Sequence, residues 1–436
     1  MTQIIRGGVE SVGDITLMVE TTGNDNDLTR PQKISSGDWS TKPFLTIQAA
    51  IDALPSNLIK THIVTVNVGA GTFAGFQVIG FSVRSTTSVF TPFLIQGTRQ
   101  TATPAIGPSS GVATGGGGRT LVLTGAGWTV DDLVGRYVRI TAGAGAGQIL
   151  LIAKNTTDTI YFSTIPSPAF AAGSTFVIED LATIISSSSS YSSASVVITR
   201  CTGGRVLIQD LKVASASSIS FLLSESMRSG FIRCVASYVT GASIGFNFNQ
   251  IDMTTISNCG AVGPFGTGFQ YQGIIYAVVS GFLAYNCSTG INLSAISWFF
   301  SSSSYLRNCS TGLAASNAEP QLTGYMFEAC SQGLSLEQVS SALLVNSVFD
   351  NCTSKNMSLR MANLIIRGTL TGTGSTGFGM NAKGAGNVVS LESTPTVSGT
   401  LGGVTVDGTT DFTWAALASS DNYTVDTVTG ARIHRR

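Results

Sequence analysis

Two carboxylates, Glu328 and Asp350, stand 22 residues apart, and each lies two positions before a cysteine. The same position in the two preceding cysteine segments holds Arg307 and Tyr285. Glycoside hydrolysis uses two carboxylates about 5–10 Å apart, one as acid and the other as base or nucleophile. The pattern therefore makes Glu328 and Asp350 candidate catalytic residues, and Tyr285 and Arg307 candidate binding residues.

Three interpretations of this group stay open. It could cleave a glycosidic bond, or bind sugar as a strip of Tyr, Arg and carboxylate side chains. It could also be a solvated ladder of surface ion pairs, which contributes little to stability and has no chemical role.

A second group, Trp298-Phe299-Phe300 with Tyr305, could form an exposed aromatic platform for sugar rings. Side chains alternate between the two faces of a strand, so at least one of the three consecutive rings must be buried. Packing in a core is therefore the alternative for these rings. Trp298 is the candidate binding residue of this group.

The sequence offers few residues for a metal or cofactor. Its two histidines, His62 and His434, are far apart, and its seven cysteines are an odd number without short-range pairing. A G-x-G-x-x-G match at residues 372–377 does not join a strand to a helix, so we expect a loop there and no phosphate site. We expect no metal site and no cofactor.

The cysteines mark an internal repeat of about 22 residues, a period typical of stacked structural units. The residue three positions before each cysteine is always apolar, and the residue directly before it is Asn in four of seven segments. Asn tolerates the bends of a strand-to-strand corner. We expect all seven to be free, buried and stacked in one axial ladder; they are Cys201, Cys234, Cys259, Cys287, Cys309, Cys330 and Cys352.

Each repeat has the pattern of a short strand, an Asn corner, a Gly turn and a further strand, as in Asn308-Cys309-Ser310-Thr311-Gly312-Leu313. About 22 residues suffice for three short strands, whose equivalents in successive coils would lie about 4.8 Å apart with parallel hydrogen bonding. The sequence therefore predicts an all-β fold, a parallel β-helix. Like charges aligned between coils repel each other, which accounts for a charge-poor chain.

The composition excludes several classes of protein. Only 11% of the 436 residues are charged, and the formal net charge is zero, which argues against nucleic acid or an anionic membrane as partner. The uncharged stretch between Asp252 and Arg307 is broken by Gly and Ser, so we expect no membrane insertion. A hydrophobic content of 43% excludes a disordered chain, and no secretory signal is expected at the N-terminus.

The N-terminal region predicts a helix from Pro43 to Pro55, capped by Ser40 or Thr41. This helix would cover the open end of the solenoid, and residues 63–68 would form the next strand. Residues 110–180 predict a small antiparallel β insert. Beyond Cys352 the rhythm fades, and residues 363–436 are expected to form a C-terminal cap or oligomerisation region.

These features together resemble the right-handed parallel β-helix superfamily of pectate-lyase-like proteins, especially bacteriophage tailspikes. The matching pieces are Gly23-Asn24-Asp25, the phrase from Pro43 to Ile51, the turn Gly69–Phe73 and the Asn-Cys coils. The fold hosts adhesins, lyases and hydrolases alike, so it does not decide the activity. The acids of the coils are too scattered for the calcium site of a pectate lyase.

The resemblance implies a trimeric virion surface protein that binds host polysaccharide. The expected organisation is an attachment segment for other virion proteins (1–40), cap helix and first coils (41–109), insert (110–180), β-helix coils (181–362) and C-terminal region (363–436). The alternatives are a purely structural capsid decoration or head-fibre protein, and a polysaccharide-degrading enzyme.

Overall fold

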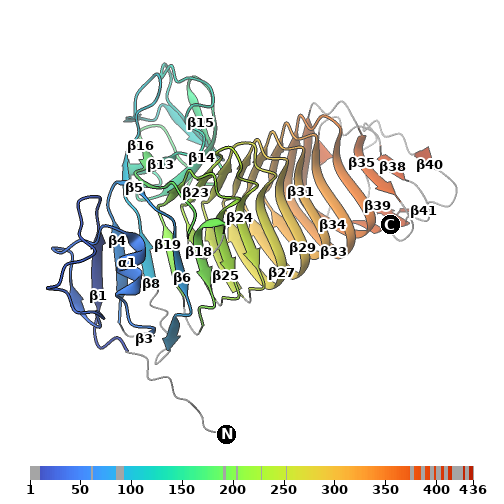
Figure 1. Cartoon of the computed structure of the whole chain (residues 1–436). Coiled ribbons are helices and arrows are strands. Elements are labelled where there is room, and N and C mark those ends of the chain that lie inside the picture. The colour runs from blue at the N-terminus through green and yellow to red at the C-terminus, as the bar shows by residue number, and fades with distance from the viewer. Residues whose placement is uncertain are drawn as a thin grey trace, which may run out of the picture.

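The chain winds into a parallel β-solenoid of about 14 turns with almost no helix (Figure 1). The computed structural model describes residues 10–373 except 60–61, 85–92, 190–192, 203–204, 227 and 252, and the backbone of short strands between 378 and 435. The all-β parallel solenoid predicted from the cysteine repeat is confirmed.

Each coil of the solenoid contributes a strand to each of three faces. Face 1 contains β18 (Ala194–Thr199), β21 (Ile219–Ser224), β24 (Ile244–Asn249) and the first halves of β27 (Thr267–Ser280), β29 (Thr289–Ser302), β31 (Thr311–Thr323), β33 (Gln332–Asp350) and β34 (Lys355–Thr373). Face 2 contains β19 (Val206–Gln209), β22 (Ser229–Ile232), β25 (Met253–Ser257) and later parts of the long strands. Face 3 contains β20 (Lys212–Val213), β23 (Val235–Ser237), β26 (Gly260–Val262), β28 (Leu283–Tyr285), β30 (Tyr305–Arg307), β32 (Met326–Glu328) and the ends of β33 and β34.

Left-handed backbone conformations form the corners between the faces. Asn258, Asn286, Asn308 and Asn351 all have φ between 52° and 62°, so the Asn corners predicted from the sequence are confirmed. Corner 1, between faces 1 and 2, also recurs in successive coils with φ of 47° to 61°, at Arg200, Glu225, Gln250, Gly273, Ala295, Asn317, Gln338 and Met361. Gly and Asn adopt this left-handed conformation at a lower energetic cost than other residues do.

The seven cysteines are free and buried, as expected, but the expectation of a single ladder is wrong. Cys201 follows corner 1, Cys234 and Cys259 follow corner 2, between faces 2 and 3, and the last four cysteines follow corner 3, between face 3 and the next coil. At each of the three corners a residue with positive φ is followed by a buried side chain, which is Cys in these seven cases and a larger one, such as Ile274 or Phe282, in other coils. The cysteine alignment could not separate corners that make the same demand.

The glycine three positions after Cys287, Cys309 and Cys330 is not a turn residue. Gly290 lacks a positive φ, and a Cβ atom added to it would lie 2.5 Å from the carbonyl oxygen of Gly312 in the next coil. Gly268 and Gly312 meet the same obstacle, at 2.7 Å and 2.6 Å. The repeated glycine therefore allows the backbones of adjacent coils to approach closely.

Ladders of like side chains fill the solenoid interior. Phe221, Phe246 and Phe269 stack in consecutive coils, with ring centroids 4.5 Å and 4.8 Å apart and planes within 7° of parallel. Phe327 and Phe349 repeat this arrangement at 4.6 Å. Burial of apolar surface in these ladders is the main stabilising contribution to the fold.

The N-terminal helix is shorter than predicted. Helix α1 (Ile47–Asp52) has Thr46 as its N-cap, with the Thr46 hydroxyl accepting a hydrogen bond from the Ala49 amide, so Ser40 and Thr41 do not cap it. The free edge of β1 (Ile15–Val19) is paired by segment 37–44, which includes β2 (Gly37–Asp38). Helix α1 packs beside β1, β4 (Val64–Val68) and β6 (Phe76–Ile79). The segment, and not the helix, covers the edge of β1.

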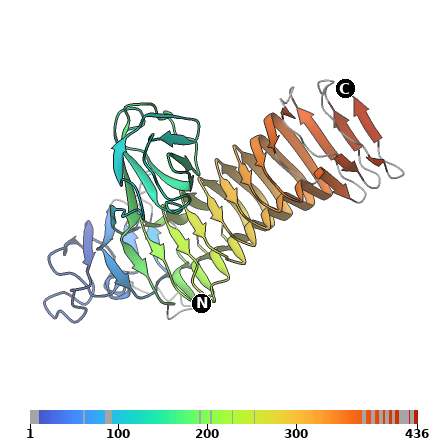
Figure 2. The same cartoon turned by 90° about the horizontal axis from the view of Figure 1, so that it is seen from above.

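The insert leaves the solenoid after β8 (Phe93–Gln96) and returns at β17 (Thr183–Ile185). Its strands pair antiparallel throughout; they are β9 (Arg99–Thr101), β10 (Ser110–Val112), β11 (Gly115–Gly117), β12 (Thr120–Val122), β13 (Tyr137–Ala142), β14 (Ile149–Asn155), β15 (Thr159–Phe162) and β16 (Thr175–Leu181). It has its own core around Trp128, Phe162 and Phe176. Figure 2 shows the insert standing against one side of the solenoid.

Parallel pairing continues beyond residue 363. The strands β35 (Phe378–Lys383), β36 (Val388–Glu392), β37 (Val397–Ser398), β38 (Val404–Val406), β39 (Asp411–Trp414), β40 (Asp426–Thr427) and β41 (Arg432–Arg435) extend the solenoid. This region therefore adds coils, and its role in oligomerisation stays a prediction. Residues 374–377 of the G-x-G-x-x-G match lie outside the described residues.

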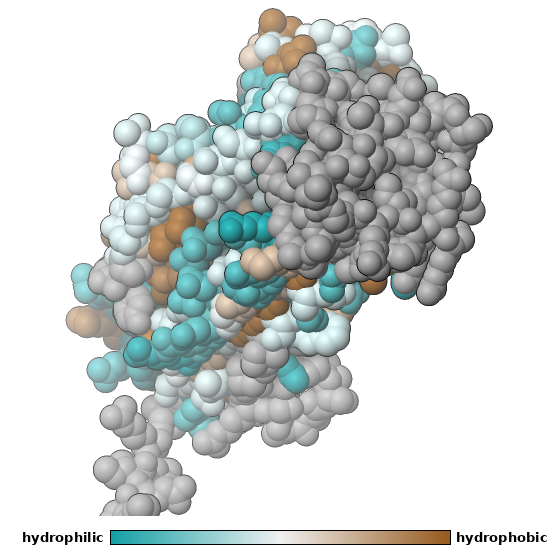
Figure 3. Space-filling view, turned by 90° about the vertical axis from the view of Figure 1, so that its right-hand side faces the viewer, coloured by the Kyte–Doolittle hydropathy of each residue, from teal (hydrophilic) through white to brown (hydrophobic). Residues whose placement is uncertain are grey.

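On the face shown in Figure 3, the described residues are mostly pale or hydrophilic, with separate hydrophobic patches. Within the described part of the chain, no helix has the length and apolar character needed to cross a membrane.

Candidate functional site

The predicted strip of chemical side chains exists on face 3. Tyr285, Arg307, Glu328 and Asp350 are register partners in consecutive coils, one each from β28, β30, β32 and β33. The stacking expected from the repeat is therefore confirmed for these four residues. Their surroundings differ from the expected open surface, because the insert packs against this face.

Glu328 lies at the contact between the insert and the solenoid, with its residue only 6% exposed. Its Oε1 atom is 2.5 Å from Nζ of Lys154, which comes from β14 of the insert. The hydroxyl of Tyr305 donates a hydrogen bond to the other carboxylate oxygen. Burial, and then the charge of Glu328, raise the pKa of Tyr305 above its usual range, so this phenol stays protonated as a donor.

Arg307 joins the same cluster. Its Nη1 atom donates to Asp131 of the insert at 2.7 Å, and its Nε atom lies 3.5 Å from Glu328 without making a hydrogen bond. Burial tends to lower the pKa of Arg307, but the hydrogen bond and charge of Asp131 outweigh it, and the pKa is raised. The guanidinium carbon lies 5.3 Å from the centroid of the Tyr285 ring.

Further contacts hold the insert against faces 2 and 3. Arg119 donates to the carbonyl oxygens of Ser163 and Gly324, and burial lowers its pKa to about 10. The Tyr137 hydroxyl donates to the Asn258 carbonyl oxygen at 2.9 Å. An apolar cluster closes the interface; it contains Tyr137, Leu151, Ala153, Leu181, Val235, Leu283 and Tyr305. Glu328 and Arg307 therefore lie within an interface, and their roles in catalysis and sugar binding stay predictions.

Trp298 lies on a different face from this cluster. It belongs to the face 2 part of β29 and is 47% exposed, whereas Phe299 and Tyr305 are buried. Its ring stacks on Phe300, with centroids 6.1 Å apart and planes 7° from parallel, and Tyr276 packs against Phe300 at 5.4 Å. Phe299 is the buried ring that the alternation of side chains along a strand predicts, and Trp298 presents an exposed aromatic surface.

Irregular pairing places Trp298 at the surface. In the pairing of β29 with β31, Ile296 faces Ala318 and Phe299 faces Pro320, so two residues of β29 oppose Glu319 alone. The pairing of β33 with its neighbours shifts in the same part of the coil. A β-bulge changes the direction of a side chain and is common beside functional sites.

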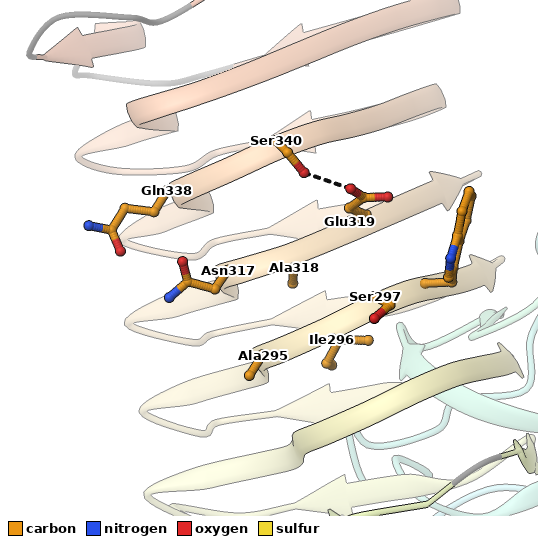
Figure 4. A pocket seen from close by; sticks show the side chains of 9 residues that line it. Ala295, Ile296, Ser297, Asn317, Ala318, Glu319, Gln338 and Ser340 are labelled. Carbon is orange, nitrogen blue, oxygen red and sulfur yellow. Dashed lines mark hydrogen bonds between the residues drawn. The ribbon is translucent and has the colours of Figure 1, made fainter.

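An open groove of about 490 Å³ lies at corner 1 beside these irregularities (Figure 4). Three successive coils line it: Ala295, Ile296, Ser297 and Trp298 from β29, Asn317, Ala318 and Glu319 from β31, and Gln338 and Ser340 from β33. The groove therefore combines one indole ring with amide, hydroxyl and carboxylate groups.

The polar groups of the groove are partly ordered. The Ser340 hydroxyl donates to the Glu319 carboxylate at 2.6 Å. Asn317 and Gln338 occupy corner 1 with φ of 50° and 53°, and both are exposed. Among the nine lining residues, Glu319 carries the only charge. This set can stack against and hydrogen-bond a ligand, but it lacks the pair of carboxylates that glycoside hydrolysis uses.

No cluster of three His, Cys, Asp or Glu side chains that could hold a metal ion occurs in the described part of the chain.

The comparisons with known proteins return structures but no sequence family. No family model matches the chain, and no curated protein matches it. The tailspike gp49 of Pseudomonas phage LKA1 is similar over 85% of this chain and 75% of its own, at 12% identity and a TM-score of 0.21.

Two further solved structures show the same kind of similarity. The tailspike gp54 of Acinetobacter baumannii bacteriophage AP22, solved with A. baumannii capsular saccharide, matches 86% of this chain and 68% of its own, at 11% identity and a TM-score of 0.20. A protein described as a glycoside hydrolase matches 89% of this chain and 95% of its own, at 8% identity and a TM-score of 0.27. At such identities the likeness concerns the fold alone.

Trp298 is the one lining residue of the groove that the sequence predicts as a binding residue. Asn317, Glu319, Gln338 and Ser340 are not predicted as site residues by the repeat. The irregular lengths of neighbouring coils around residues 297 and 340 are the available signal, because an extra residue in a strand indicates a bulge.

Proposed function

We propose that this chain is a tailspike-like bacteriophage virion surface protein that binds host cell-surface polysaccharide through the groove beside Trp298. The exposed indole ring next to a polar groove is the observation that supports this proposal most directly. The parallel solenoid and the sequence resemblance to tailspikes support the virion location.

The chemistry of the groove fits sugar. A sugar ring has one face of C–H groups, which packs on the electron-rich face of an aromatic ring. Its hydroxyl groups donate and accept hydrogen bonds, and the amides of Asn317 and Gln338 and the hydroxyl of Ser340 can do both. Concave sites of this kind, with an aromatic wall and a few polar groups, are typical of binding sites for small molecules.

Assembly belongs to the same proposal. The resemblance implies a homotrimer and attachment to other virion proteins through residues 1–40. The mass of the purified protein in solution tests the trimer, since a lone 45.2 kDa chain would contradict it.

Replacing Trp298 tests the proposed function. We expect Trp298→Ala to weaken binding to host polysaccharide at least tenfold, because the stacking surface is lost, while Trp298→Phe keeps part of the affinity. Binding to purified capsular polysaccharide and O-antigen of the host, measured by surface plasmon resonance, gives the result. The control is Leu28→Ala, which removes a 98% exposed side chain far from the groove.

The outcomes separate the competing functions. Equal binding by the wild type and Trp298→Ala would overturn the groove as the site. No binding of any host polysaccharide would overturn the proposal and favour a purely structural decoration or head-fibre protein. Shortened polysaccharide after incubation would show that the protein is a degrading enzyme.

A further inference from the structure

We propose, resting on the function above, that the groove accepts an uncharged polysaccharide lying along the solenoid axis, and that Glu319 weakens the binding of glycans with acidic sugars. The inference concerns the class of ligand and the residue that selects it. It follows from the arrangement of the lining residues and from their charge.

The arrangement sets the direction of the ligand. The lining residues form two rows that run from coil to coil. One consists of Ala295, Asn317 and Gln338 at corner 1 (Figure 4). The other lies on face 2, where Trp298 opposes Glu319 in the pairing of β29 with β31 and Ser340 hydrogen-bonds Glu319. Successive coils repeat about every 4.8 Å. A linear polymer placed along the axis between the rows contacts all three coils, the indole ring of Trp298 on one and the polar side chains of the next two, whereas one placed across the axis leaves the groove after one coil.

The charge of the groove sets the class of ligand. Glu319 is half-buried, and its hydrogen bond from Ser340 fixes the carboxylate on the face 2 row. On the next two coils, Glu337 and Arg360 lie directly before corner 1, pair with each other at 3.1 Å and are both exposed. The pair contributes no net charge, so the groove has a net negative charge from Glu319.

A negative groove disfavours uronic acids, sialic acids and other anionic sugars, because like charges at short range repel. It does not disfavour hydroxyl or acetamido groups, which can donate to the carboxylate and exchange hydrogen bonds with Asn317 and Gln338. The repulsion acts near the surface, so salt weakens it.

The test compares neutral and acidic polysaccharides. Purified bacterial capsular polysaccharides and O-antigens, with uncharged or with acidic repeat units, are immobilised on an array and probed with the full-length protein at low and high salt. Each neutral polysaccharide that binds is also presented after oxidation of part of its primary hydroxyls to carboxylates, which changes the charge and keeps the chain.

We expect binding to uncharged polysaccharides and a loss of about threefold to tenfold after oxidation, diminishing at high salt. Glu319→Gln should restore binding of the oxidised form, because the Gln oxygen still accepts from Ser340 while the charge is gone. The matched control is Glu225→Gln, which removes an exposed carboxylate at an earlier corner 1 position.

Each outcome decides a separate point. Binding that prefers acidic polysaccharides, or that ignores oxidation, would overturn the inference and leave the proposed function standing. A Glu319→Gln variant that still discriminates would overturn the role of Glu319. A wild-type protein that binds none of the polysaccharides would overturn both the inference and the proposed function.

Discussion

The carboxylate of Glu328 lies between the solenoid and the insert, where its contacts give it a structural role. Both of its oxygens are engaged, one by Lys154 and one by Tyr305, and the insert covers it. Removing one partner of a buried ion pair leaves the other charge without compensation, which is more costly than the pair itself is stabilising. Asp350, one coil further on, is half-buried, and its Oδ1 atom accepts a hydrogen bond from the Asn351 side chain at 3.0 Å.

This difference gives a prediction for the two carboxylates. Glu328→Gln should destabilise the protein by about 1.5–3 kcal/mol, because Lys154 loses a charged hydrogen-bond partner in a buried site. Asp350→Asn should change the stability by less than Glu328→Gln does, because the site is half-buried and the Asn oxygen can still accept from the Asn351 side chain. The thermal midpoint of unfolding, compared with the wild type at one scan rate, measures both.

The same variants test the catalytic hypothesis. If the protein shortens a polysaccharide and Glu328→Gln stops this in a folded sample, Glu328 is a catalytic residue and our structural assignment is incomplete. Equal midpoints for both variants would contradict the structural role outright.

Among the elements, the strand that follows corner 3 leaves little room between adjacent coils. A side chain at Gly290 would meet the carbonyl oxygen of Gly312 at 2.5 Å, and the coils cannot separate without breaking their parallel hydrogen bonds. Gly268 and Gly312 occupy the same position in the two adjacent coils and lie similarly close to their own neighbours. The adjacent coils therefore cannot move to make room for a side chain at Gly290.

We therefore expect Gly290→Ala to lower the yield of folded protein sharply, or to destabilise it by more than about 3 kcal/mol, beyond the range of most point mutations. Gly115→Ala is the control: its added Cβ would lie 3.7 Å from the nearest atom, an ordinary contact. Soluble expression and the thermal midpoint report the difference. A Gly290→Ala protein as stable as Gly115→Ala would show that the coils can move apart.

The elements also show which features the sequence could predict. Apolar residues before each cysteine and Asn at the corners repeat because every coil faces the same packing problem, so the solenoid and the stack from Tyr285 to Asp350 were predictable. The insert was predictable as an antiparallel module. Its position over Glu328 was not, because contacts such as Lys154 with Glu328 join residues that no local pattern connects.

The groove could not be predicted from the sequence, for a related reason. Its residues come from three coils and are brought together by irregular pairing, which breaks the repeat used to predict the fold. A pattern that identifies the regular part of a solenoid cannot place the residues where the regularity fails.

For the molecule as a whole, the buried thiols make the stability depend on pH. Burial raises the pKa of Cys201 to about 11 and that of Cys352 to about 12, and burial also raises the pKa of Cys234. The folded state therefore keeps these protons at a pH where the unfolded chain, with thiol pKa values near 9, releases them. Because the unfolded state then binds fewer protons, stability falls as pH rises above about 9.

Arg119 acts in the opposite sense. Its pKa of about 10 in the folded state is below the usual value, so the folded state loses that proton first and stability rises with pH only above 10. Between pH 9 and pH 10 the thiols therefore dominate the change in stability.

We expect the thermal midpoint of unfolding, measured with a reductant present, to be flat from pH 7 to 8 and to fall from pH 9 to 10. Cys201→Ala should lower the midpoint at every pH but make this alkaline slope shallower. A midpoint that stays constant up to pH 10 would mean that the thiols also stay protonated in the unfolded chain, or that they reach water in the folded one; rapid labelling of the native protein by a thiol reagent would identify the second case.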